Sequence, residues 1–133
     1  MREIKFRGIP LFGESFVFGS LIIEPNERGE DPYIIRIYEN GRVCYFEVKK
    51  DSIGQYAGLK DKNEVEIYEG DILQIDLDWG YGPAKIVSKV YFENGCFRAK
   101  ALNSHEDTLL IELPPCEVIG NIYGNPELLE GAI

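Results

Sequence analysis

Few residues in this chain combine a reactive type with a useful spacing. There is one histidine, His105, and there are three cysteines, Cys44, Cys96 and Cys116. Nucleophilic catalysis requires a nucleophile within hydrogen-bond reach of a base. A Cys96–His105 couple across neighbouring strands is conceivable, but nothing in the pattern orients the histidine. We interpret them as a surface thiol and a loop histidine.

Paired carboxylates occur once at a spacing that suits a strand. Asp76 and Asp78, at i and i+2, lie on the same face of a strand and so present oxygens to one side. The run lacks the third ligand and the distal glutamate of a calcium loop. The glycines of 80–83 lead into a strand and end at Pro83, which is typical of a turn and not of a phosphate loop. We therefore expect no metal, no cofactor and no enzymatic activity.

The remaining candidate is a small basic and aromatic patch formed by Lys89, Tyr91, Arg98 and Lys100. All four lie near Asn94-Gly95, a dipeptide that favours a two-residue hairpin turn. The resulting register places them on one face of the hairpin. Such a face suits stacking on single-stranded nucleic acid, but tyrosine and arginine are also enriched at protein interfaces. Both interpretations stay open, and the second is the more common.

Two hairpins position these residues and much of the core. The first turns at Asn40-Gly41, and its pairs run from Glu39–Arg42 to Tyr33–Val48. One face then collects the apolar residues Tyr33, Ile35, Ile37, Cys44, Phe46 and Val48. The second turns at Asn94-Gly95, with Phe92–Phe97 and Val90–Ala99 on the face opposite the basic patch. In both, a slip of one residue would exchange the two faces. This register predicts that Cys44 points into the core.

Alternation predicts shorter strands at 3–7, 15–23, 72–77, 108–113 and 117–122. A short C-terminal helix is predicted on Glu127, Leu128 and Leu129, with Asn125 as the cap, Pro126 at the first position and Gly131 at the end. The fold class is therefore mostly β, a small barrel or sandwich of antiparallel hairpins. The stretch 25–32 is a linker or a hairpin loop.

One domain of 133 residues accounts for the length. A division into an N-terminal β subdomain, 1–50, and a C-terminal barrel, 51–133, is compatible with the pattern. The Glu-Gly-Asp turn at 69–71, which leads into an apolar strand, is also found in SH3-like barrels, a fold-level analogy for the C-terminal part.

The net charge and the cysteines indicate which partners and which cellular compartment suit the protein. The net charge is −9, and the residues after Glu66 contain 11 acids against 4 bases. Such a field repels nucleic acid, and solubility is its simplest explanation. An odd number of widely spaced cysteines indicates reduced thiols and a cytoplasmic protein. The longest apolar stretch, 16–23, is too short to cross a membrane.

Three segments, read together, resemble the YopX family of bacteriophages, prophages and other mobile elements. They are 2–7 (REIKFR), 53–72 (IGQYAGLKDKN, followed by EIYEGDI) and 118–129 (VIGNIY and NPELL). The family usually has glycine after the asparagine that matches Asn63, where this chain has Glu64, which argues against a tight primed turn there. It tends to have tryptophan after the residue that matches Arg7, where this chain has Gly8. The resemblance implies a mostly-β protein that forms homo-oligomers, and it supplies no catalytic residues.

These observations lead to a functional expectation with an alternative. We expect a phage or prophage accessory protein, not an enzyme, that binds another protein and itself. The alternative is a nucleic-acid or nucleoprotein accessory factor that uses the basic patch, or an acidic mimic of DNA. We expect no membrane partner.

Overall fold

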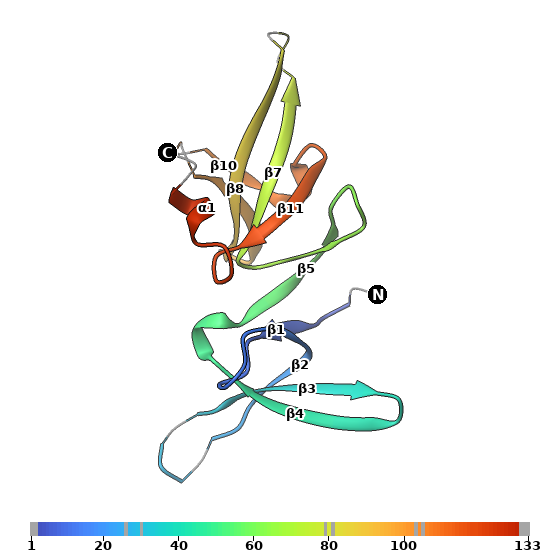
Figure 1. Ribbon diagram of the computed structural model, residues 1–133, viewed down its shortest axis with the longest axis vertical. Coiled ribbons are helices and arrows are strands. Elements are labelled where there is room, and N and C mark those ends of the chain that lie inside the picture. The colour runs from blue at the N-terminus through green and yellow to red at the C-terminus, as the bar shows by residue number, and fades with distance from the viewer. Residues whose placement is uncertain are drawn as a thin grey trace. The chain divides into compact units, whose positions relative to one another are not determined.

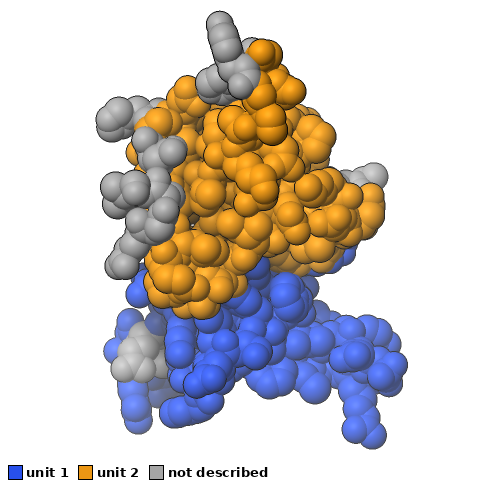
Figure 2. All heavy atoms as spheres, turned by 45° about the horizontal axis from the view of Figure 1, so that its top comes forward, with its two compact units in different colours: residues 1–56 blue, residues 57–133 orange. Residues whose placement is uncertain are grey.

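The structure, a computed structural model, describes residues 3–25, 27–29, 31–78, 80, 82–102, 104 and 106–130. Its elements are almost all strands in antiparallel sheets, with a short C-terminal helix (Figure 1), which confirms the mostly-β prediction. The chain divides into two compact units, 1–56 and 57–133, coloured separately in Figure 2.

The first unit is built from consecutive antiparallel strands. They are β1 (Phe6–Gly8), β2 (Val17–Ile23), β3 (Tyr33–Glu39), β4 (Arg42–Val48) and the start of β5 (Gly54–Lys60), in the order β4-β3-β2-β1-β5. A single 3₁₀ turn, η1 (Lys50–Ser52), precedes β5. Because β2 pairs with β3, the stretch 25–32 is a hairpin loop and not a linker.

β2 changes its pairing partner at Gly19. There β2 leaves β1 and pairs with β3, and any Cβ at this position would overlap the carbonyl oxygen of Arg36. The chain after β1 then returns to the base of β4, where the Lys49 N–H donates to the Ile9 carbonyl at 2.8 Å and the Leu11 N–H to the Glu47 carbonyl at 3.1 Å. At position 19, only a glycine permits the close approach of the Arg36 carbonyl to the backbone of β2.

The second unit is a five-stranded sheet in the order β10-β9-β8-β7-β11. Its strands are β7 (Asp71–Asp78), β8 (Pro83–Glu93), β9 (Cys96–Ala101), β10 (Asp107–Leu109) and β11 (Cys116–Asn121). The end of β5, β6 (Glu66–Tyr68) and the 3₁₀ turn η2 (Leu110–Glu112) cover one face of this sheet. The buried cluster between them comprises Ile67, Leu73, Ile75, Val90, Ala99, Leu110 and Cys116.

Of the two predicted architectures, barrel or sandwich, the sandwich is confirmed and the barrel is wrong, including the SH3-like form of the C-terminal part. In the described part of the chain, β10 and β11 end the five-stranded sheet and do not pair with each other, so the sheet stays open and the fold is sandwich-like. The predicted strand 108–113 also ends early, at Leu109. The Leu113 N–H donates to the Leu110 carbonyl at 3.2 Å, which closes η2 before Pro114 and Pro115 and turns Leu110 into the core.

Both predicted hairpin registers are confirmed pair by pair. Asn40 and Gly41, like Asn94 and Gly95, all have positive φ between 53° and 79°, the conformation of a type I′ turn. In the second hairpin the rings of Phe92 and Phe97 meet edge to face, 4.9 Å apart. The local sequence therefore determines how these strands pair.

The C-terminal helix α1 (Glu127–Glu130) is present as predicted. The Asn125 carbonyl accepts the Leu128 N–H at 3.0 Å at its start. The Asn125 side chain is not used as the predicted cap, since its Oδ1 accepts the Asn121 N–H at 3.2 Å. The predicted end at Gly131 lies outside the described residues.

Candidate interaction surfaces

The basic patch lies where the hairpin register predicts. Lys89 pairs with Lys100 and Tyr91 with Arg98, so all four share the outer face of β8 and β9, opposite the core. Lys100 is exposed and the other three are half-buried. That these side chains bind a partner stays a prediction.

The sequence analysis missed the acid that β10 adds to this patch. Asp107 pairs with Lys100 across the sheet, accepts a hydrogen bond from the Tyr91 hydroxyl and forms an ion pair with Arg98 Nε at 2.7 Å. These contacts lower the pKa of Asp107, mainly through the Tyr91 hydroxyl, and raise the pKa of both Tyr91 and Arg98. Arg98 and Tyr91 are therefore already bound to Asp107, and Lys89 and Lys100 are the other cations of the patch.

The paired aspartates have separate structural roles. Asp76 accepts from Lys62 Nζ at 3.2 Å, and this hydrogen bond raises the pKa of Lys62. Asp78 accepts the Gly80 N–H at 2.9 Å and so braces the turn that follows β7. Both are exposed, as expected for a solvated strand face that leads into a turn. In the described residues no three His, Cys, Asp or Glu side chains gather as a metal site would require.

The cysteines differ in exposure. Cys96 is exposed as predicted, but the Cys96–His105 couple cannot be placed because His105 lies outside the described residues. Cys116 is buried, and burial together with the nearby Asp61 carboxylate raises the pKa of its thiol. A thiol with a raised pKa is a weak nucleophile at neutral pH.

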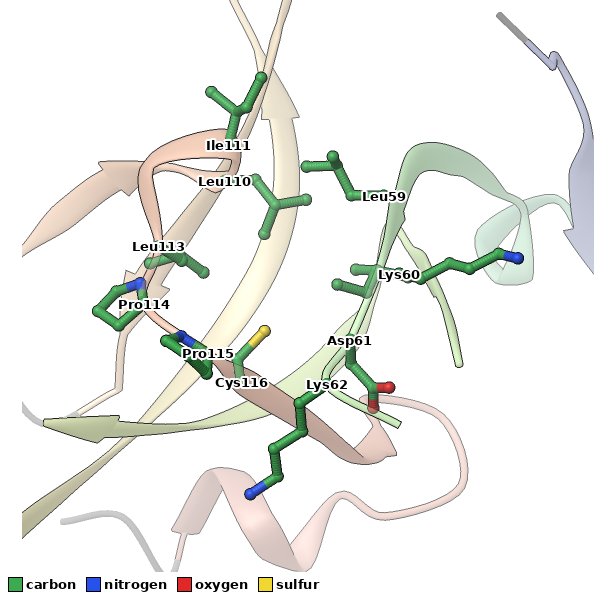
Figure 3. Close-up of a pocket in the computed structure, with 11 residues that line it drawn as sticks. Leu59, Lys60, Asp61, Lys62, Leu110, Ile111, Leu113, Pro114, Pro115 and Cys116 are labelled. Atoms are coloured by element: carbon green, nitrogen blue, oxygen red, sulfur yellow. The ribbon is translucent and has the colours of Figure 1, made fainter. Parts of the chain in front are cut away.

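The second unit contains a cavity of about 330 Å³ beside Asp61. Figure 3 shows apolar side chains around it, with the ammonium groups of Lys60 and Lys62 extending away. Its lining also includes Leu59, Ile67, Leu110, Ile111, Leu113, Pro114, Pro115 and Cys116. An apolar lining of this kind holds no activated base or nucleophile, and it resembles the floor of a binding hollow more than an active site.

The one acid at this cavity, Asp61, is committed to the backbone. Its Oδ1 accepts the N–H groups of Asn63 at 2.8 Å and Val65 at 2.9 Å, and its Oδ2 accepts that of Val118 at 2.9 Å. Burial alone would raise its pKa, but these three donors outweigh burial and hold the pKa below its ordinary value. Asp61 thus fixes the β5–β6 turn to β11. Glu64 in this turn has φ +66°, but its neighbour Asn63 does not have positive φ, so this is not the tight primed turn that Glu64 argued against.

The β3–β4 hairpin carries a group of exposed apolar side chains, and here the sequence prediction for Cys44 is wrong. Cys44 does lie on the same face as Ile35 and Val48, but it is exposed. The reason is that β2 pairs with β3 only as far as Arg36, so the distal hairpin is a two-stranded ribbon with little packed against it. Phe46, on the same face, is 38% exposed.

The other face of this ribbon is exposed as well. Tyr38 is 69% exposed, Tyr45 63% and Val43 40%. Beside Tyr45 lies an open hollow lined also by Ile22, Ile23, Glu24, Pro25 and Ile34. We call the exposed side chains of Tyr38, Val43 and Tyr45 the hairpin outer face. Alternation alone gives no signal for it, since alternation assumes that one face is covered.

Fold and surfaces together define a class: an all-β protein of two antiparallel-sheet units that exposes apolar and aromatic side chains. No described helix is long and apolar enough to span a bilayer. The comparisons then give the family. The model of the YopX protein family matches residues 5–130, and the chain belongs to the YopX family.

Two solved structures are similar over almost the whole chain. Protein EF1440 from Enterococcus faecalis is 25% identical with a TM-score of 0.59, and the match covers 97% of this chain and 99% of that one. Protein yopX from Bacillus subtilis is 23% identical with a TM-score of 0.58, covering 96% of both chains. A comparison with curated proteins gives no match. These likenesses support the fold and leave the activity open.

Proposed function

We propose that this protein is a non-enzymatic accessory protein of a phage or prophage that works in the cytoplasm by binding proteins, including further copies of itself. The mobile-element origin comes from the family resemblance. The observation that carries the binding role is the exposed apolar surface of the β3–β4 hairpin.

This surface is costly for an isolated molecule. A two-stranded ribbon is at best marginally stable in water, and uncovered aromatic and β-branched side chains on both of its faces leave apolar area in contact with solvent. Contiguous apolar patches of this kind mark interaction sites in soluble proteins. Tyrosine suits such a site because it combines a large apolar ring with a hydroxyl that tolerates exposure.

The alternative is a nucleic-acid or nucleoprotein accessory factor, which the shared face of Lys89, Tyr91, Arg98 and Lys100 favours. Asp107 weakens this alternative, because it is bound to both Arg98 and the Tyr91 hydroxyl. The net charge of −9 weakens it as well, because it repels nucleic acid. A gel-shift titration with single-stranded and duplex DNA at low salt separates the two. Retardation at micromolar protein that Lys100→Glu abolishes would support the alternative.

The binding role is tested by affinity capture from cells carrying the element. Tyr38→Lys adds a charge to the hairpin outer face without touching the edge of the sheet. Phe12→Lys, at a fully exposed aromatic residue of the same unit, is the matched control. We expect the wild type and Phe12→Lys to retain the same partner protein and Tyr38→Lys to lose most of it. No partner for the wild type, or equal capture by all three, contradicts the proposal.

A further inference from the structure

The edge of β4 offers unused backbone groups to a partner. β4 ends the sheet order of the first unit, so apart from the isolated bridge between Val48 and Pro10 its neighbour among the described strands is β3. Native proteins protect such edges with charges, prolines or bulges. The segment Val43-Cys44-Tyr45-Phe46 carries no charge and no proline, and all four residues favour strands or pack well in them. An edge of this composition is prone to pair with another strand.

The direction in which the outward backbone N–H and C=O groups of β4 point follows from the hydrogen bonds at the base of the strand. The Glu47 carbonyl accepts the Leu11 N–H, so the backbone groups of Glu47 point away from β3. Since these groups alternate along an antiparallel strand, those of Tyr45 and Val43 point the same way. Those of Cys44 point toward β3, where it pairs with Ile37.

We propose that a second copy of this chain adds its β4 to this edge, antiparallel, about a two-fold axis at Cys44. This proposal rests on the self-association in the proposed function and specifies its site. In a symmetric antiparallel pair the axis passes through a single residue. An axis at Cys44 joins Val43 to Tyr45 of the second copy, and Tyr45 to its Val43, which uses all four outward groups of these two residues.

Neighbouring registers fit less well. An axis at Tyr45 requires the Glu47 carbonyl, which Leu11 already occupies. An axis at Val43 places Tyr45 opposite Gly41 in the turn, outside the strand. With the axis at Cys44, the paired segment is 42–46 in both copies and ends just before Glu47.

The side chains also match in this register. Val43 lies opposite Tyr45 of the second copy, a β-branched and aromatic pair that stabilises sheets. On the other face Arg42 lies opposite Phe46, where a guanidinium can stack on the ring. No two like charges are opposed. The hairpin outer face stays accessible, so the dimer and a second partner protein can coexist.

Cross-linking at Cys44 tests this geometry. Residues directly opposite in a non-hydrogen-bonded antiparallel pair have Cα atoms about 4.5 Å apart, within the range of a disulfide, about 4.4–6.8 Å. In a Cys96→Ser background, Cys44 is the exposed thiol that remains among the three cysteines. Mild oxidation with copper phenanthroline at micromolar protein should convert most of the chain into a covalent dimer on a non-reducing gel. Cys44→Ser in this background should give none.

A proline variant shows that the edge is responsible. Val43→Pro removes an outward N–H and leaves the bonds to β3 in place, so the fold should persist by circular dichroism while cross-linking falls at least tenfold. Tyr38→Lys, in β3, should keep cross-linking unchanged. A wild-type dimer by sedimentation without cross-linking at Cys44 overturns the edge geometry and leaves self-association standing. A monomer at every concentration overturns both.

Discussion

Replacing Asp61 by asparagine should destabilise the second unit because one buried carboxylate accepts hydrogen bonds from three backbone N–H groups. Asparagine keeps one oxygen and presents an NH₂ group where the other was, so either Val118 or the pair Asn63 and Val65 faces a donor. A lost charge-assisted hydrogen bond and an N–H that then faces another donor together cost about 2–4 kcal/mol. For a chain of this size, that lowers the Tm by roughly 10 °C.

The loss of unfolding free energy in Asp61→Asn should also depend on pH with a defined sign. The folded pKa of Asp61 lies below its ordinary value, so its contribution is complete above the unfolded pKa of about 3.8 and is lost as the pH falls through the lower folded pKa. The difference in unfolding free energy between the wild type and Asp61→Asn should therefore be constant from pH 5 to 8 and should shrink below pH 4.

Urea unfolding followed by far-UV circular dichroism measures both effects. Glu112→Gln, which removes the same charge from an exposed side chain of the same unit, is the control and should change the unfolding free energy by less than about 0.5 kcal/mol. Equal stability of Asp61→Asn and the wild type at pH 7 would refute the reasoning. So would a deficit as large at pH 3 as at pH 7.

Two further predictions concern the strained turn and the thiols. Because Glu64 has φ +66°, Glu64→Gly should raise the unfolding free energy by about 0.5–1 kcal/mol. The control Glu93→Gly, at a strand position of negative φ, should lower it. If Glu64→Gly lowered the unfolding free energy in urea, the turn would not be strained. With maleimide at pH 7.5, Cys44 and Cys96 should react at least about a hundredfold faster than buried Cys116. Equal rates, read by intact mass, would contradict the burial of Cys116.

The sequence predicted pairing well because pairing is local here. Each Asn-Gly turn requires positive φ at two successive residues, which sets the register of the strands on either side. The faces then follow from alternation, including the shared face of Lys89 and Arg98. The end of the strand predicted at 108–113 was missed, because the turn before Pro114 is stabilised by burying Leu110, a tertiary effect.

What the sequence could not predict depends on contacts between distant segments. Cys44 has the alternation of a core residue, yet no third strand covers the distal ribbon. Asp107 reaches Tyr91 and Arg98 only because β10 pairs with β9. Asp61 gains its third donor from Val118, 57 residues away. A polar residue between two lysines gives no sign of that role before the fold is known.

The central claim, that the β3–β4 hairpin is a binding surface whose edge pairs with a second copy, is tested most directly by amide hydrogen exchange resolved residue by residue. In dilute protein the Cys44 N–H, bonded to β3, should be protected while those of Val43 and Tyr45 exchange freely. At high concentration the account predicts that Val43 and Tyr45 become as protected as Cys44. Free exchange of both amides at every concentration would contradict it.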